Sequence, residues 1–285
     1  TPSDNVNLTY QINGNLLVTT QVEDGSQVVI RWVKGVNLAD HEAQLTRSWR
    51  VIGVEVNGAD TPVLDYLEAD QNADTVVFQL LADGTFRAFW LSGSEIVDAM
   101  EGSWATGGGA IAVTDSEGNV MRGDYVVNNT SVTLLDGEGD TVKFELTPWA
   151  PEANHAPALV GTWEAQSVTV NGTAVPLDQF FNWEPNTVSM SVYFYADGTF
   201  ISAELDNNGE PTAAEFGTWS TVGNTLTINV DETMVMTYAI AGDTATLTMQ
   251  QDGDQVVLTF TRIWSRTSLP FGSRVRFPCG ANCIS

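Results

Sequence analysis

The chain has 285 residues, enough for two ordinary domains, and 43% of them are hydrophobic, which excludes a disordered polymer. It carries 36 acidic against 11 basic side chains, and the net charge of -25 excludes nucleic acid and anionic membrane surfaces as partners, because both repel it. No apolar run reaches the length of a membrane span, so we predict no membrane insertion.

Residues 1–44 hold three predicted strands but no complete domain. The stretch YQINGNLLVTTQVEDGSQVVIRWVKG, residues 10–35, alternates apolar and polar residues and is interrupted by the turn pairs NG and DG. Similar sequences begin at Tyr125 and at Tyr238, and each forms the end of a later segment. We interpret residues 1–44 as a truncated repeat, the last three strands of a larger unit, followed by a linker.

The rest of the chain repeats with a period of 114 residues. Trp49 corresponds to Trp163, and the sequence ADGTF occurs at residues 82–86 and again at 196–200. Agreement at many fixed positions indicates duplication. The predicted organisation is a first complete repeat at 45–148, a proline-rich stiff linker at 149–158, a second complete repeat at 159–264 and a basic tail at 265–285.

Each complete repeat is predicted to be all-β. Runs such as TVVFQLL, TFRAFWL and TLTINV are β-branched and aromatic, and Gly- and Asp-rich turns separate them at short intervals. About eight such runs per repeat predict two tandem antiparallel eight-stranded barrels, preceded by the three-stranded remnant. One helical turn is expected in each repeat, opened by Pro62 in the first and Pro176 in the second, where it would cap a barrel end.

Four short motifs of the second repeat resemble those of bacterial lipocalin-like domains, a family of small secreted or lipoprotein-borne β-barrels. They are LVGTW (159–163), YADGTF (195–200), GTWS (217–220) and LTFTR (258–262). The resemblance implies a barrel opened by Gly161-Thr162-Trp163, with Arg262 packed over Trp163 in a cation–π contact. It also implies a ligand-carrying activity. The first repeat departs from the motif, because Trp49 has no Gly two residues before it and Pro148 stands in place of Arg262.

An isolated three-stranded sheet would leave one apolar face uncovered. In the remnant this face is predicted to hold Ile12, Leu17, Val28, Ile30 and Trp32. The tail has the opposite character, since Arg274 and Arg276 alternate with Val275 and Phe277 in a strand pattern with one basic and one apolar side. We therefore expect the tail of one copy to dock on the remnant of the next, together with other barrel surface of that neighbour; the alternative is that the remnant folds back on residues near Leu45.

The two cysteines, Cys279 and Cys283, stand four residues apart in the tail. That spacing predicts a small disulfide-closed loop in an oxidising compartment, with linkage to a neighbouring chain as the alternative. Two cysteines do not make a structural zinc site.

Other candidates for chemistry are weak. The acidic turn at Asp136, Glu138 and Asp140 places oxygens at alternate positions, as calcium prefers, but Asp-Gly is also the usual hairpin chemistry. The two histidines, His41 and His155, have no nucleophile motif beside them and are expected to be solvated. Aromatic residues such as Phe89, Trp90, Tyr193 and Tyr195 are expected in the core rather than in a pocket.

Two functions from different classes remain. The first is a structural subunit of an extracellular filament or surface appendage, assembled head-to-tail with other copies of itself. The alternative is a secreted lipocalin-like carrier of a small apolar ligand. An enzyme is not expected, no cofactor is implied beyond a weak calcium site, and the predicted location is extracellular or at the cell surface after removal of a signal peptide.

Overall fold

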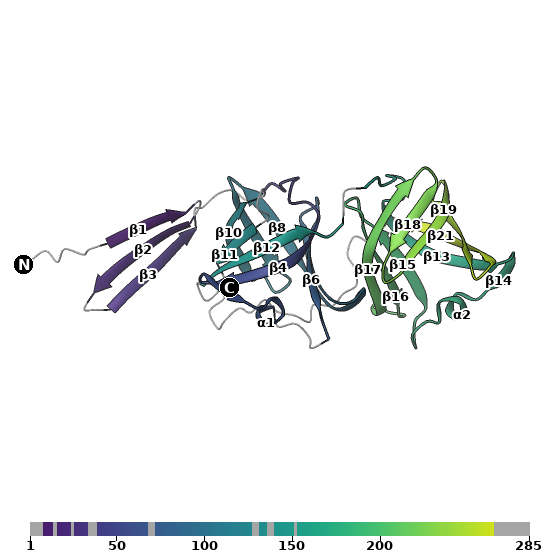
Figure 1. The fold of residues 1–285 in the computed structure, drawn as a ribbon, viewed down its shortest axis with the longest axis horizontal. Coiled ribbons are helices and arrows are strands. Elements are labelled where there is room, and N and C mark those ends of the chain that lie inside the picture. The colour runs from purple at the N-terminus through teal and green to yellow at the C-terminus, as the bar shows by residue number, and fades with distance from the viewer. Residues whose placement is uncertain are drawn as a thin grey trace, which may run out of the picture.

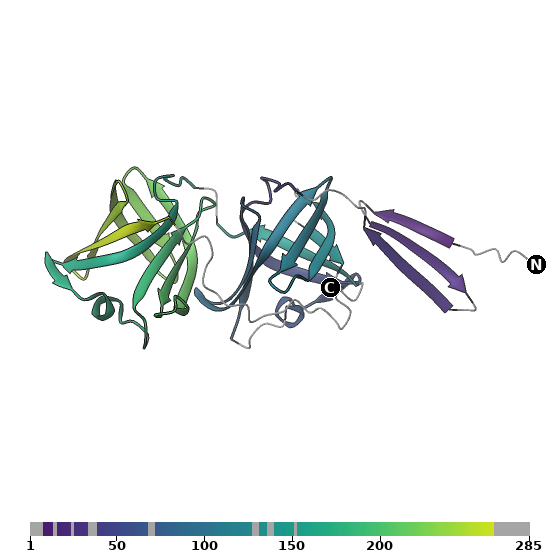
Figure 2. The same cartoon turned by 180° about the vertical axis from the view of Figure 1, so that it is seen from behind.

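The computed structural model describes residues 8–13, 16–23, 26–33, 39–67, 72–126, 131–135, 140–150 and 153–264. Within them the chain is all-β, with two antiparallel barrels side by side and a separate three-stranded sheet beyond the first barrel (Figures 1 and 2). The all-β prediction is confirmed. No helix in these ranges has the length and apolar character of a membrane span.

The first barrel has eight strands in its ring, and β12 closes it by pairing with β4. A short strand, β5, forms a hairpin with the end of β4. The elements are β4 (Ser48–Val56), β5 (Ala59–Thr61), α1 (Val63–Tyr66), β6 (Thr75–Leu80), β7 (Thr85–Ser92), β8 (Glu95–Gly107), β9 (Ala110–Asp115), β10 (Val120–Val126), β11 (Ser131–Leu135) and β12 (Thr141–Pro148).

The second barrel repeats this order and closes through β21 and β13. Its elements are β13 (Gly161–Val170), β14 (Thr173–Val175), α2 (Leu177–Phe181), β15 (Ser189–Phe194), β16 (Thr199–Leu205), β17 (Pro211–Val222), β18 (Thr225–Asn229), β19 (Thr233–Ala241), β20 (Thr244–Gln251) and β21 (Asp254–Ile263). The expected helical turns are present, and Pro62 and Pro176 precede α1 and α2 as predicted.

The three-stranded sheet consists of β1 (Leu8–Asn13), β2 (Leu16–Glu23) and β3 (Ser26–Val33). Its register is that of the last three strands of the second barrel. Tyr10 pairs with Thr19 as Tyr238 pairs with Leu247, two periods further along the chain. The sheet pairs with no described strand of either barrel.

Glycine is required where two strands approach closely at the start of the GSW and GTW motifs. A Cβ atom on Gly102 would lie 2.1 Å from the carbonyl oxygen of Thr114, and one on Gly217 would lie 2.4 Å from that of Asn229. Both distances are shorter than any real Cβ contact, so these glycines let the tryptophan-bearing strand cross its neighbour.

The two barrels share a buried apolar face, which we call the junction. It is formed by outward-facing residues of β6, β7 and β8 and of the equivalent strands β15, β16 and β17. Phe89 of the first barrel and Phe216 of the second have ring centroids 5.1 Å apart. The junction residues are Val77, Phe89, Leu91, Ala99, Tyr193, Ile201, Ala203, Leu205, Ala214 and Phe216. The continuous apolar runs of these strands therefore reflect burial on both sides.

A buried polar network crosses the junction. Arg87, whose side chain is 3% exposed, forms an ion pair with Glu101 at 2.9 Å and donates to the Tyr195 hydroxyl of the second barrel at 3.0 Å. Burial raises the pKa of Tyr195, so its hydroxyl stays protonated. A second crossing contact joins the backbone N–H of Ser48 to the carboxylate of Asp197 at 2.7 Å. These bonds fix how one barrel sits on the other.

The segment between the barrels, predicted as a stiff linker at 149–158, makes contacts with the second barrel where the structure describes it. Trp149 packs against Phe216 in the junction with ring centroids 5.6 Å apart. The carbonyl of Asn154 accepts a hydrogen bond from the backbone N–H of Thr221 at 2.7 Å. The described part of this segment is thus docked, because Trp149 packs against the apolar junction between the barrels.

Candidate functional site

The interior of the second barrel contains a cavity of about 240 Å³. Side chains that point inward from all eight of its ring strands surround it, and Phe181 of α2 closes one end. Almost all of them are apolar, and four are methionines, whose flexible side chains suit a binding surface. The lining residues are Leu159, Trp163, Phe181, Met190, Val192, Phe194, Phe200, Ser202, Glu215, Ile228, Met234, Met236, Ala245, Leu247, Met249, Leu258 and Phe260.

Two polar side chains face this cavity, Ser202 of β16 and Glu215 of β17. They stand opposite each other in the sheet, and the Ser202 hydroxyl donates to a carboxylate oxygen of Glu215 at 3.3 Å. Ser202 is buried, whereas part of Glu215 is exposed to solvent. Glu215 therefore marks a place where the cavity opens.

Partial burial against the cavity wall raises the pKa of Glu215 above its ordinary value of 4.5. The hydrogen bond from Ser202 opposes this shift, while the carboxylates of Asp231, Glu204 and Glu95 add to it. Glu215 is therefore a carboxylate held among other negative charges, in contact with an apolar interior.

Trp163 also lines the cavity, and Arg262 packs on its ring. The indole N–H of Trp163 donates to the carbonyl of Leu159 at 2.7 Å, and the guanidinium carbon of Arg262 lies 4.3 Å from the centre of the Trp163 ring. Arg262 also donates to the carbonyl of Val160 at 2.8 Å. The structure thus brings together the two residues that the resemblance paired, in a contact of about 1 kcal/mol.

In the first barrel an arginine also packs on the tryptophan of the first strand, but it comes from a different place in the chain. Trp49 is buried, donates to the carbonyl of Leu45 at 2.9 Å, and pairs in the sheet with Pro148 where Trp163 pairs with Arg262. Arg47, two residues earlier in the chain, lies 5.5 Å from the Trp49 ring and supplies the cation from the other side. The lipocalin-like motif does not predict this replacement, because Arg47 precedes the tryptophan instead of coming from the last strand.

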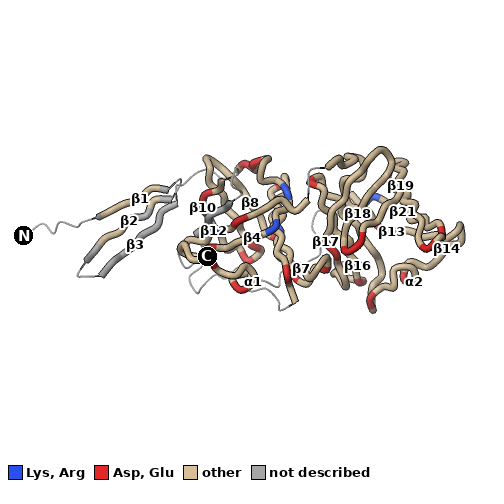
Figure 3. The backbone as a smooth tube through the Cα atoms, viewed as in Figure 1, with Lys and Arg blue, Asp and Glu red and all other residues tan. Residues whose placement is uncertain are grey.

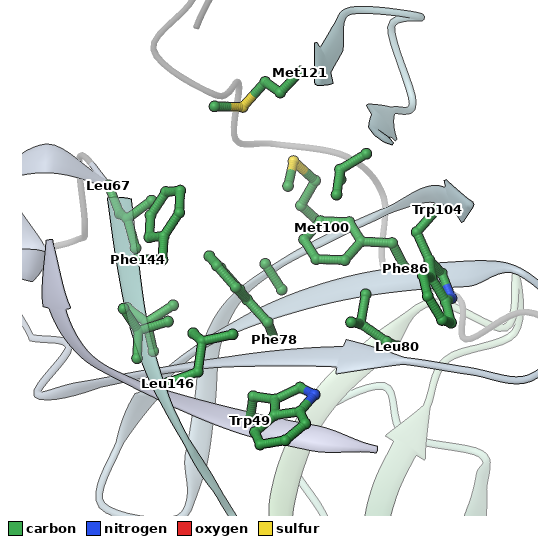
Figure 4. Packing of buried hydrophobic residues seen from close by; sticks show 14 of the residues in the cluster. Trp49, Leu67, Phe78, Leu80, Phe86, Met100, Trp104, Met121, Phe144 and Leu146 are labelled. Carbon is green, nitrogen blue, oxygen red and sulfur yellow. The ribbon is translucent and has the colours of Figure 1, made fainter. Parts of the chain in front are cut away.

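Buried apolar side chains gather in the interior of the first barrel, among them Phe78, Phe86 and Phe144 (Figure 4). The positions of Ser202 and Glu215 are occupied there by Ala88 and Met100, which are paired in the same way and are fully buried. Trp90 stands where the second barrel has Glu204 and is 2% exposed. The expectation that Trp90 belongs to the core is confirmed, whereas Phe89 and Tyr193 lie in the junction.

The prediction that His41 and His155 are merely solvated is wrong. Each packs on the tryptophan of the GSW or GTW motif: His41 lies 5.1 Å from Trp104, and His155 lies 4.9 Å from Trp219. The rings sit directly over the ADGTF turns, whose glycines have positive φ and leave room for them. Their spacing of one repeat period was the sequence signal for this structural role.

Where the structure describes them, the acidic residues of the turns form hydrogen bonds that stabilise the hairpins. A carboxylate oxygen of Asp140 accepts a hydrogen bond from the Asn57 side chain at 2.7 Å, and Asp254 does the same for Asn171. Asp136 and Glu138 lie outside the described residues. Across the described ranges, no three His, Cys, Asp or Glu side chains gather as a metal site requires.

The residues predicted to mediate assembly are described only in part. Tyr10 and Ile12 of β1 are exposed, at 71% and 65%, and Leu17 is half-buried. The side chains at Val28, Ile30 and Trp32 lie outside the described residues, although the β3 backbone places these positions in register with Val256, Leu258 and Phe260, two periods later. Cys279 and Cys283, and the tail positions Arg274, Val275, Arg276 and Phe277, also lie outside the described residues.

Comparison with known families finds a similarity for the second barrel. A family model described as a lipocalin-like domain matches residues 159–263, the span of the second barrel. No curated protein matches the chain. The family match and the closed barrel together support a lipocalin-like fold.

Proposed function

We propose that the second barrel binds a small apolar ligand in its interior, and that the protein is a lipocalin-like binding protein without enzymatic activity. The observation that carries this proposal is the apolar cavity of about 240 Å³ among the inward-facing side chains of the second barrel. Ligand cavities of drug-sized molecules have volumes of about 300–1,000 Å³, so a compact ligand is expected here. The first barrel would then serve as a scaffold.

Filling the cavity tests this function. We expect n-octanol to bind the wild-type protein saturably in calorimetry, and Ala245→Leu to weaken binding by at least about tenfold, since the larger side chain occupies the ligand's space. Ala239→Leu is the matched control, because Ala239 is exposed on the outer face of the same barrel. Circular dichroism would show that both variants are folded. Absence of saturable binding to the wild type, or equal binding by the two variants, would contradict the proposal.

A second function, a subunit of an extracellular filament, is favoured by the three-stranded sheet. Tyr10 and Ile12 are exposed, whereas Tyr238 and Ile240, two periods later, pack half-buried against the core of the second barrel. An apolar sheet face of this kind needs a covering partner. We propose another copy of the chain as this partner, with the basic tail at 265–285 attracted to the acidic body of its neighbour.

The assembly is tested by light scattering and electron microscopy. The wild-type protein is expected to form polymers, while the double variant Tyr10→Asp/Ile12→Asp and a deletion of residues 266–285 remain monomeric. Val222→Asp is the control, because Val222 is an exposed apolar residue of the second barrel at 78% exposure. A wild-type protein that is monomeric at all concentrations, or a deletion variant that still polymerises, would count against assembly.

For either function we propose an extracellular or cell-surface location. The strongly acidic composition and a cysteine pair suited to an oxidising compartment support it.

A further inference from the structure

We propose that the cavity of the second barrel selects an apolar molecule that ends in a protonated amine, with the amine held by Glu215 and the chain directed into the barrel. This inference rests on the proposed ligand-binding function and names the chemical class of the ligand.

The first argument is the small number of polar groups in the cavity. Ser202 and Glu215 are the two polar side chains among its lining residues, and they form one hydrogen-bonded pair. Polar groups that are few and placed together fix the orientation of a ligand, because the remaining wall offers no hydrogen-bond partner. A carboxylate accepts hydrogen bonds and does not donate them, so the complementary ligand group is a donor.

The second argument is electrostatic. The carboxylates of Asp231, Glu204 and Glu95 act on Glu215, and all three carry the same sign of charge. Glu204 comes from β16, Asp231 from the turn after β18, and Glu95 from the first barrel, where it pairs with Glu215 across the junction. Acidic segments are visible beside β16 and β17 in Figure 3. A ligand carboxylate would be repelled here, and an ammonium group would be attracted.

Third, Glu215 lies where the cavity opens to solvent. β18 is shorter than β17 and pairs only with Thr218–Val222, so the first part of β17, including Glu215, lies beyond its end. Glu215 and Met234 both line the cavity and are both exposed, which places the opening between β17 and β19. A charged end held at this opening stays partly hydrated, while the apolar chain is buried. This arrangement avoids the cost of burying an ion.

The fourth argument is the contrast between the repeats. The pair Ser202–Glu215 replaces Ala88–Met100 of the first barrel at the same rung of the same two strands. Met100 is fully buried in a packed core, whereas Glu215 contacts an open space of about 240 Å³. A carboxylate at a core-facing position destabilises a barrel unless a ligand or water compensates it. The polar pair and the cavity occur together, as expected for a site that recognises a ligand.

The test compares octylamine, n-octanol and octanoate, which share one chain length and differ in the charge of the head group. Calorimetry on the wild-type protein is expected to show the highest affinity for octylamine, a lower affinity for n-octanol and the lowest for octanoate. In Glu215→Gln the affinity for octylamine should fall by about five- to tenfold, while that for n-octanol stays the same, because one charge-assisted contact is lost. Glu210→Gln removes the same charge from an exposed turn of the same barrel and serves as the matched control.

A pH series adds a second readout. The affinity for octylamine should fall as the pH is lowered through the raised pKa of Glu215, since the carboxylate is ionised only above that pKa, and octylamine itself stays protonated throughout. The affinity for n-octanol should not change over this range.

The outcomes separate this inference from the proposed function. If n-octanol binds but octylamine is not preferred, or if the preference survives in Glu215→Gln, the amine specificity is wrong and the ligand cavity stands. If none of the three compounds binds, the proposed function itself is wrong.

Discussion

Replacing Arg87 by alanine is expected to destabilise the protein by about 3 kcal/mol, because a buried ion pair loses one partner and the other charge is left uncompensated. Glu101 would lose its ion-pair partner, and Tyr195 would lose the hydrogen bond that reaches it from the first barrel. The value is at the lower end of the usual range, since the Glu101 side chain is 31% exposed. Denaturant unfolding followed by circular dichroism measures the loss.

Two further variants show where the loss arises. Arg87→Met keeps most of the buried volume and should lie between the wild type and the alanine variant. Arg122→Ala removes an exposed arginine of the first barrel and should change stability by less than about 0.5 kcal/mol. If Arg87→Ala is no less stable than Arg122→Ala, the junction network does not hold the barrels together.

Replacing Trp219 by alanine is expected to cost about 3–5 kcal/mol of unfolding free energy. The side chain is 1% exposed, its indole N–H donates to the carbonyl of Tyr195 at 2.9 Å, and its ring packs edge-on against Phe194. Its removal leaves a void under the ADGTF turn and takes away one of the two hydrogen bonds to the carbonyl of Tyr195, which still accepts from the backbone N–H of Gly198. The loss is again measured by denaturant unfolding.

A milder substitution at the same position can be measured even if the alanine variant does not fold. Trp219→Phe keeps a ring but loses the hydrogen bond and should cost about 1–2 kcal/mol. The control is Trp264→Ala, since Trp264 is 75% exposed and should have little effect. Equal stability of the Trp219 and Trp264 variants would show that the second barrel is not built around Trp219.

Much of the fold was predictable because it is repeated. Turn pairs such as Asp-Gly and apolar runs of strand length identified the strands, and the equivalence of Trp49 and Trp163 identified two copies of one unit. The structure places both tryptophans in the same environment, each bonded to the carbonyl of a leucine four residues earlier. Local patterns of this kind depend only on neighbouring residues, so one sequence is enough to recognise them.

The junction was not predictable in the same way. The run at Thr75–Leu80 is buried on both faces, and sequence periodicity identifies such a strand without saying what covers its second face. Only the three-dimensional arrangement shows that Phe89 meets Phe216.

Glu215 was missed for a related reason. A single glutamate in a strand is normally exposed, and its inward position depends on the register with Ser202. A comparison of the two repeats, position by position, could have found it, because methionine at the same place in the first repeat indicates a core position.

The junction also has a consequence for how many barrels can associate. Both barrels contribute the same three strands to it, so the contact has the character of a homodimer whose two halves were joined into one chain. Tethering keeps the halves at a high local concentration, which makes the pairing permanent. A contact of this type closes on itself, since each barrel presents the same three strands to the other. Any third barrel would have to attach through a different surface, and a chain of such units would be built from pairs.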